Sequence, residues 1–131
     1  MQPSETTNVD PAVLRLRSLL IEEFASSGRL GTHERVATLL GPAVADSFNR
    51  RLVNLHHWLE ALAAHEANAG RPMLTAVVVS DRTGLPTEGF FSCADALGYE
   101  TGSTRADRLR FWASQVSKTL DHWHASRPDG S

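Results

Sequence analysis

The first residues able to do chemistry form a polar and basic set in the first half of the chain. Its members are Arg29, Arg35, Ser47, Asn49, Arg50 and Arg51. Arginine and asparagine suit contacts with phosphates and base edges. If Val44, Phe48 and Leu52 face the core, helical spacing turns Ser47, Arg50 and Arg51 outward. We therefore predict that these six residues bind nucleic acid; a solvated helix face, paired with Asp46 and Glu34, is the alternative.

A second set contains histidines and carboxylates. His56 and His57 share helix faces with Glu60, at i+4 and i+3 respectively, and His65 precedes Glu66. The spacing is not the H-E-x-x-H pattern of zinc proteases, in which two histidines stand four residues apart. Polar side chains on a helix surface, or a histidine packed under the strand, are the favoured interpretations, and we predict that the chain holds neither a metal nor another cofactor.

The third candidate is Cys93, which follows Phe90, Phe91 and Ser92. A thiol near the start of a helix can have a lowered pKa. A catalytic thiol also needs a base and an oxyanion site, and the residues around Cys93 show no such signature. A small buried core residue is the favoured interpretation, and the chain is predicted not to be an enzyme.

Composition limits the classes of function that remain. The chain has 131 residues and a formal net charge of −2, which fits one domain and argues against a broad, non-specific nucleic-acid binder. The single cysteine fits a reducing compartment. The sequence shows neither a long apolar span nor a signal peptide. We expect a cytoplasmic protein with no membrane partner.

Helices are predicted to position these residues. Asp10-Pro11 starts a helix over residues 11–26, and Thr32 caps a short helix that Gly41-Pro42 ends. A helical run over 43–68 follows, with a predicted break near Val53-Asn54. A short helix over 92–98 and a last helix over 104–124 complete the set. The last helix has a predicted buried stripe of Leu109, Trp112, Val116, Leu120 and Trp123.

One stretch favours β-structure. Residues 74–79 are rich in valine and apolar on both faces, so a covered strand is predicted there. Asp81 to Gly84 form a predicted turn, and residues 85–90 form a short edge strand or extended wing. We predict an α+β, mostly helical domain over 10–124, between flexible tails at 1–9 and 125–131.

The run from Gly28 to Gly41, with Thr32, Val36 and Ala37 between them, resembles the entry of a helix-turn-helix. It is similar to the DNA-binding domain of alkylguanine-DNA alkyltransferases and alkyltransferase-like proteins, with His33 in place of a tyrosine. The resemblance implies a winged-helix-like domain with a recognition helix over 43–52, a wing over 81–89 and an added C-terminal helix. The reactive proline-cysteine-histidine-arginine motif is replaced by Arg71-Pro72-Met73-Leu74, so alkyl transfer is not implied.

The apolar stretch also resembles a small uncharacterised bacterial family with the signature P-L-L-S/T-A-L/V-V-V-x-x-x-T-G-x-P-G-x-G-F. Residues 72–79, Thr83-Gly84, Pro86 and Gly89-Phe90 fit it, and Thr87 departs from it. No activity carries over from that family. The sequence thus predicts a non-catalytic protein that binds double-stranded DNA. A protein-interaction module of the accessory, inhibitor or immunity type is the alternative.

Overall fold

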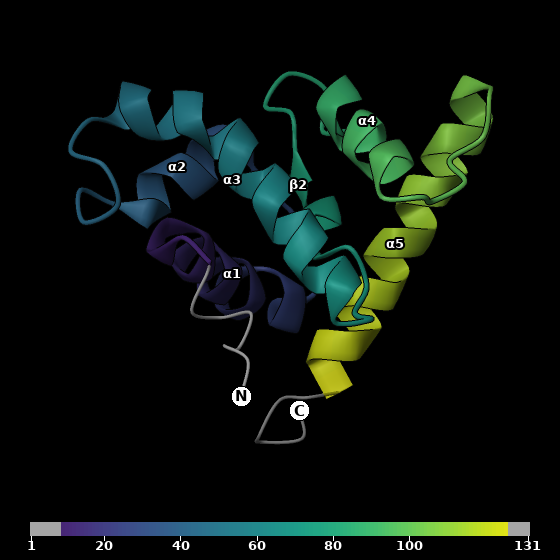
Figure 1. Ribbon diagram of the computed structural model, residues 1–131, viewed down its shortest axis with the longest axis horizontal. Coiled ribbons are helices and arrows are strands. Elements are labelled where there is room, and N and C mark those ends of the chain that lie inside the picture. The colour runs from purple at the N-terminus through teal and green to yellow at the C-terminus, as the bar shows by residue number, and fades with distance from the viewer. Residues whose placement is uncertain (1–8, 126–131) are drawn as a thin grey trace, which may run out of the picture.

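The computed structural model describes residues 9–125 (Figure 1). Its helices are α1 (Pro11–Glu23), α2 (His33–Leu40), α3 (Phe48–Asn68), α4 (Glu88–Ala96) and α5 (Arg105–Ala125), with two 3₁₀ turns, η2 (Ala25–Ser27) and η3 (Leu74–Val77). Two short strands, β1 (Gly31–Thr32) and β2 (Val78–Val79), pair in parallel, with Gly31 opposite Val78. The prediction of a mostly helical domain is confirmed. Apart from Val9 and Ala125, the predicted tails lie outside the described residues.

Helices α1, α2 and α3 pack against one another around the larger of two hydrophobic clusters. The predicted start of α1 and the predicted bounds of α2 are confirmed, whereas α1 ends at Glu23, three residues before the predicted end, and the 3₁₀ turn η2 follows. The Asp10 carboxylate caps α1 by accepting a hydrogen bond from the Ala12 N–H at 2.8 Å. The Thr32 hydroxyl caps α2 by accepting one from the Arg35 N–H at 3.2 Å. Gly41, with φ of 75°, follows the last residue of α2.

Helix α3 differs from its prediction at its start and in its middle. It begins at Phe48 rather than at residue 43, because the Ser47 hydroxyl caps it by accepting a hydrogen bond from the Arg50 N–H at 3.0 Å. The predicted break at 53–54 is wrong. Leu55 and Leu62 continue one buried face, so the helix runs unbroken to Asn68.

The predicted strand over 74–79 is mostly wrong. Only Val78 and Val79 form a strand, and Leu74–Val77 is the 3₁₀ turn η3. The segment is buried as expected, but its sole pairing partner among the described residues is the two-residue strand β1. Buried backbone groups need hydrogen bonds, and a strand without neighbours leaves them unmade. Turn η3 makes some of these backbone hydrogen bonds within the segment itself.

Helix α5 supplies other hydrogen bonds to this buried segment. Gln115 Oε1 accepts one from the Met73 N–H at 3.2 Å, and the Thr119 hydroxyl donates one to the Met73 carbonyl at 3.1 Å. Trp112 Nε1 donates to the Ala76 carbonyl at 2.9 Å. The most buried residues of α5 are therefore Gln115 and Thr119. The predicted apolar stripe is only half-buried; its residues are Leu109, Trp112, Val116, Leu120 and Trp123.

The predicted wing is also wrong. Residues 81–87 form a turn and a loop, closed where the Ser80 N–H donates to the Leu85 carbonyl at 2.9 Å. Helix α4 then starts at Glu88, four residues before the predicted helix at 92. Glu88 in its first turn interacts favourably with the helix dipole. Phe91 is buried, and Arg108 Cζ lies over its ring, 4.8 Å from the ring centre. The described residues therefore do not show a winged helix.

A buried ion cluster ties α1 to the end of α3. Glu66 has no exposed surface, and its carboxylate accepts hydrogen bonds from Arg17 Nε and Arg71 Nε, both at 2.7 Å. Burial alone raises the pKa of Glu66, but the two arginines outweigh it and hold that pKa below its usual value. The Arg17 guanidinium also lies 5.2 Å from the ring centre of Trp123, which links the cluster to α5.

Candidate functional site

The six predicted nucleic-acid-binding residues lie in different places on the structure, and their side chains make different contacts. The Ser47 hydroxyl caps α3 by accepting a hydrogen bond from the Arg50 N–H. Asn49 and Arg50 are exposed on the first turn of that helix. Arg29 and Arg35 line a separate hollow beside η2 and α2, where Glu23 and Thr32 also contribute. Arg29 there donates a hydrogen bond to the Glu23 carbonyl at 3.2 Å.

Arg51 corrects the prediction most clearly, because it does not point outward. Its residue is 8% exposed, its Nε donates to the Ala37 carbonyl at 2.8 Å, and its Nη1 donates to the Ala45 carbonyl at 2.7 Å. The prediction assumed that Phe48 faces the core, but Phe48 is 37% exposed. The buried face of α3 instead runs through Leu55, one turn after Arg51.

An uncovered face remains on the first half of α3. Asn49, Arg50, Val53 and His57 are all exposed, and Val53 is 74% exposed. Residues 49, 53 and 57 follow one another at four-residue spacing, so they share one side of the helix with Arg50 beside them. From Phe48 to Leu59 the helix contains no acidic residue; Glu60 is the first. This face, Asn49, Arg50, Val53 and His57, is called the α3 outer face below.

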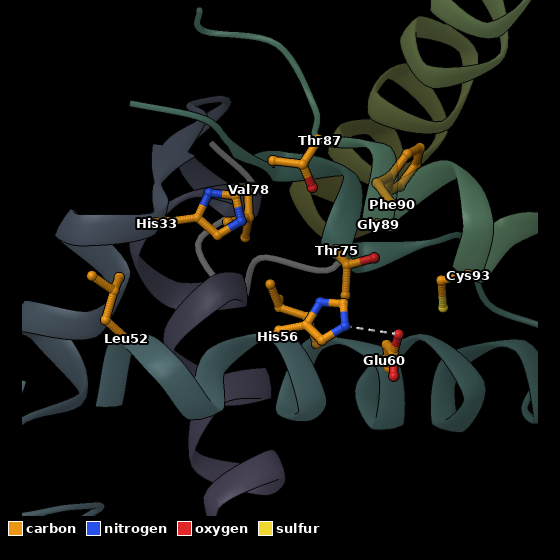
Figure 2. A pocket seen from close by; sticks show the side chains of 11 residues that line it. His33, Leu52, His56, Glu60, Thr75, Val78, Thr87, Gly89, Phe90 and Cys93 are labelled. Carbon is orange, nitrogen blue, oxygen red and sulfur yellow. Dashed lines mark ion pairs between the residues drawn. The ribbon is translucent and has the colours of Figure 1, made fainter. Parts of the chain in front are cut away.

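A cavity of about 100 Å³ lies on another side of α3, between α2, α4 and the η3–β2 segment (Figure 2). Its apolar wall consists of Leu52, Leu59, Val78 and Phe90. Its polar lining consists of His33, His56, Glu60, Thr75 and Thr87, with Cys93 and Gly89 from α4. The cavity thus combines an apolar wall with several hydrogen-bonding groups from different elements, which is the usual composition of a ligand site.

His33 stands at one side of this cavity and is held by β2. Burial lowers the pKa of its imidazole, although a hydrogen bond to the Val79 backbone and the charge of Asp81 partly oppose that effect. His33 is therefore neutral at pH 7, with one ring nitrogen left as an acceptor. The Asp81 carboxylate also accepts a hydrogen bond from the Glu34 N–H at 3.2 Å, which secures the start of α2.

Two threonine hydroxyls line the cavity without using their hydrogen-bonding capacity elsewhere. Thr75 is 6% exposed, and its hydroxyl has no partner among the residues that the structure describes. Thr87 is the N-cap residue of α4, yet its side chain makes no capping hydrogen bond. Figure 2 shows both side chains projecting into the space between His33 and Phe90. The Thr75 hydroxyl oxygen is not fully buried, since Trp123 Nε1 is the one buried side-chain polar atom without a partner among the described residues.

Two members of the predicted histidine set, His56 and Glu60, lie with Cys93 at the other end of the cavity, and the set is otherwise dispersed. His56 Nε2 lies 3.2 Å from a Glu60 oxygen. Burial and the negative charge of Glu60 raise the pKa of the Cys93 thiol, which therefore stays protonated at neutral pH. Figure 2 places His33 and Cys93 at opposite ends of the lining. Across residues 9–125, no three histidine, cysteine or acidic side chains are arranged to hold a metal ion.

Sequence reasoning missed Thr75, Thr87 and Gly89 as parts of one site. A signal for Thr75 was present, since it is the one hydroxyl inside the apolar run from Met73 to Val79. The signal for Gly89 was weaker, and this residue was interpreted as a glycine of the predicted wing. A Cβ at that position would approach His56 Cε1 to 3.2 Å, so glycine lets α4 lie close to α3.

Comparison of the chain with protein-family models, with curated proteins and with solved structures gave no match. No helix within residues 9–125 combines the length and apolar character needed to span a membrane. Functional inference therefore depends on the two features described above, the α3 outer face and the cavity.

Proposed function

We propose that this protein binds double-stranded DNA through the α3 outer face, without catalysing a reaction. One observation carries the proposal: a helix exposes Asn49 and Arg50 on its first turn, and its first twelve residues, Phe48–Leu59, contain no acidic side chain. Asparagine reads adenine and arginine reads guanine or phosphate. The positive end of the helix dipole adds to their attraction for a phosphate backbone.

The packing of α3 supports this role. Helices α1 and α2 pack against its opposite side and hold α3 in place, so the α3 outer face remains exposed on a packed three-helix unit. Recognition helices of helix-turn-helix proteins contact base edges with their N-terminal residues. Residues 41–47 separate α2 from α3, which is longer than the usual turn of about three or four residues. The proposal therefore requires the exposed helix, and it does not require a wing.

The roles of the six predicted residues change accordingly. Asn49 and Arg50 contact DNA, Val53 offers an apolar contact to a thymine methyl group, and Arg29 and Arg35 are at most flanking phosphate contacts. Ser47 and Arg51 act indirectly, because one caps α3 and the other anchors it to α2. A face with about two or three phosphate contacts implies weak binding that falls roughly 10- to 40-fold between 50 and 200 mM salt.

Fluorescence anisotropy with a labelled duplex of mixed sequence, at 50 and 200 mM salt, tests the proposal. Arg50→Ala should weaken binding about fivefold or more, because a good arginine contact contributes roughly 1–3 kcal/mol. Arg105→Ala is the matched control, since Arg105 is also exposed on the first turn of a helix, and Figure 1 shows that helix on the other side of the molecule. An equal loss in both variants, or no binding at 50 mM salt, would refute the proposal.

A protein partner is the second candidate, and the exposed apolar side chains favour it. Phe48 and Val53, at 37% and 74% exposure, both lie on the first two turns of α3. Val53→Lys separates the two candidates. The added positive charge should preserve or strengthen DNA binding, whereas it should disrupt an apolar contact with an accessory, inhibitor or target protein. Loss of a co-purifying partner with this variant would favour the second candidate.

A further inference from the structure

We infer that the cavity between α2, α3 and α4 binds a small alkylammonium ion, whose charged group pairs with the Glu60 carboxylate. Among the described residues that line the cavity, Glu60 is the one carboxylate, and there is neither a lysine nor an arginine. The lining therefore carries a negative charge that no permanently positive side chain in the wall balances. This site is distinct from the α3 outer face.

The Glu60 carboxylate has room for another partner. Its Oε2 atom lies 3.2 Å from His56 Nε2, whereas its Oε1 atom has neither a hydrogen bond nor an ion pair within residues 9–125. A carboxylate can accept several hydrogen bonds, and an ammonium group donates them. The Glu60 side chain is 47% exposed, so an ammonium group can reach it and keep part of its hydration. Pairing at a half-exposed carboxylate thus avoids the cost of burying the ligand's charge.

Cys93 indicates how the cavity treats a negative charge. Its thiol lines the same space, and burial, together with the negative charge of Glu60, raises the pKa of that thiol. The thiolate is disfavoured there because burial removes its hydration and Glu60 repels it. The same two effects act against an anionic ligand, whereas Glu60 attracts a cation.

The ammonium group is expected at the Glu60 end of the cavity rather than beside His33. Burial is the largest influence on the pKa of His33 and lowers it, so the His33 side already disfavours a positive charge. Figure 2 shows the Phe90 ring on the Cys93 side of the space, and an aromatic ring attracts an ammonium ion. The positive end of the α4 dipole acts mainly within the first helical turn, and Cys93 lies in the second.

The apolar part of the lining favours a short hydrocarbon stem. The cavity volume of about 100 Å³ is smaller than the roughly 150 Å³ of an engineered cavity that holds benzene, so about four to six non-hydrogen atoms fit. Leu52, Leu59 and Val78 in the wall can pack against methyl groups. Isobutylammonium has this size, with a branched apolar stem and one positive charge. Isobutanol has nearly the same shape without the charge, and isobutyrate carries a negative charge.

The test is a titration of the full chain, ¹³C-labelled at its leucine and valine methyl groups, with isobutylammonium chloride, isobutanol or sodium isobutyrate. Spectra are recorded at matched ionic strength and about pH 8, where ordinary imidazoles are neutral and alkylammonium groups keep their proton. Isobutylammonium should shift the Leu52, Leu59 and Val78 methyl resonances saturably, with a dissociation constant in the millimolar range. Isobutanol and isobutyrate should each bind at least about threefold more weakly, because they lack the charge that pairs with Glu60.

Two results of this titration would overturn the inference. One is binding of isobutanol or isobutyrate within about threefold of isobutylammonium, since the Glu60 charge would then not select the ligand. The other is the absence of a saturable shift up to about 100 mM isobutylammonium.

Glu60→Gln assigns the charge selectivity to one residue. The substitution keeps the side-chain shape and removes the charge, so isobutylammonium affinity should fall about threefold or more while isobutanol affinity stays the same. Glu22→Gln is the matched control, because Glu22 is an exposed glutamate on α1 outside the lining. An equal loss of both ligands in folded Glu60→Gln, or unchanged isobutylammonium affinity, would contradict the proposed pair.

A second variant assigns the hydrocarbon stem to the cavity. A Cβ at Gly89 would lie 3.2 Å from His56 Cε1, so Gly89→Ala takes space from the lining. Isobutylammonium and isobutanol should both bind more weakly to it. Ser92→Ala, on the exposed side of the same helix, is the control. Unchanged affinity for both ligands in folded Gly89→Ala would contradict binding in this cavity. None of these outcomes depends on DNA binding.

Discussion

Arg51 Nε lies 2.8 Å from the Ala37 carbonyl oxygen, so this arginine fastens α3 to α2. Its Nη1 reaches the Ala45 carbonyl as well, at 2.7 Å, and thereby holds the connection between the two helices. Arg50, the preceding residue, is exposed. Neighbouring arginines on one helix turn therefore differ in environment: Arg51 is buried and bonded to the backbone, whereas Arg50 is exposed, where we propose that it contacts DNA.

Arg51→Ala should lower the free energy of unfolding by roughly 1–3 kcal/mol, because it leaves carbonyl groups without donors. Arg51→Lys should recover little of that loss, since an ammonium group cannot reproduce the planar fork that reaches two carbonyls. Urea unfolding followed by circular dichroism measures both. Arg50→Ala serves as the control and should unfold at the wild-type urea concentration. Equal stability of Arg51→Ala and wild type would show that the two hydrogen bonds are not stabilising.

The buried Glu66 should make stability decrease in acid. Its folded-state pKa is below the ordinary 4.5 because of Arg71 and Arg17, so the unfolded chain binds the proton more readily. The stabilisation is complete above pH 4.5 and disappears as pH falls through the folded-state pKa. Melting temperatures between pH 7 and pH 2.5 should show this loss.

Glu66→Gln tests the assignment at constant pH. It removes the negative charge between two arginines, and breaking such a buried pair costs roughly 3–5 kcal/mol. Glu22→Gln is the control, because Glu22 is exposed on α1 and should tolerate the change. If both variants unfolded alike at pH 7, Glu66 would not be the residue that holds α1 against α3.

His33 should produce a separate pH dependence nearer neutrality. Burial lowers its pKa, so the unfolded chain takes up a proton at a higher pH than the folded one. Stability should therefore be full above the unfolded value of 6.5 and should decline as pH falls below it. His33→Gln should flatten the change in melting temperature between pH 7.5 and 5. The same substitution at the exposed His124 should leave that slope unchanged.

The contacts of α5 with Met73 should also be measurable. Thr119→Val and Gln115→Leu preserve much of the side-chain volume. Gln115→Leu leaves the Met73 N–H unpaired, at about 1–3 kcal/mol. Thr119→Val should cost less, because the Met73 carbonyl keeps the hydrogen bond from the Ala76 N–H. Ser117→Ala, on the exposed side of α5, is the control. Because both sites act on one residue, the double variant should depart from additivity. Chemical denaturation of the four variants and the wild type measures these losses. If Thr119→Val unfolded at the wild-type denaturant concentration, the Thr119 hydrogen bond would not be stabilising.

Local signals in the sequence predicted the helix ends well. Asp10 and Thr32 act through hydrogen bonds to residues two and three positions away, and Gly41 acts through its own positive φ, so the information needed to recognise them is local. The last helix was also located within one residue at each end. Ser47 was read as a surface contact rather than a cap, and this error moved the start of α3 by five residues.

Non-local information was needed for the rest. Residues 74–79 have the composition of a strand, but strand formation depends on neighbouring strands, and within residues 9–125 the only neighbour is the pair Gly31 and Thr32. The direction of the Arg51 side chain depends on which side of α3 packs against α1 and α2. The prediction took Phe48 to be on that side, but Phe48 is exposed. The cavity joins residues from five elements, α2, α3, η3, β2 and α4, so no single stretch of sequence contains it.

The hydrogen bonds from α5 to the Met73–Ala76 backbone have a consequence for aggregation. This apolar segment, with its valines and incomplete sheet, would offer unpaired backbone groups to a strand of another chain if α5 moved away. Side chains of a helix thus occupy the backbone groups just before β2, where most sheets use charge or proline to protect an edge. Conditions that loosen α5 should favour β-rich aggregates before the remaining helices unfold.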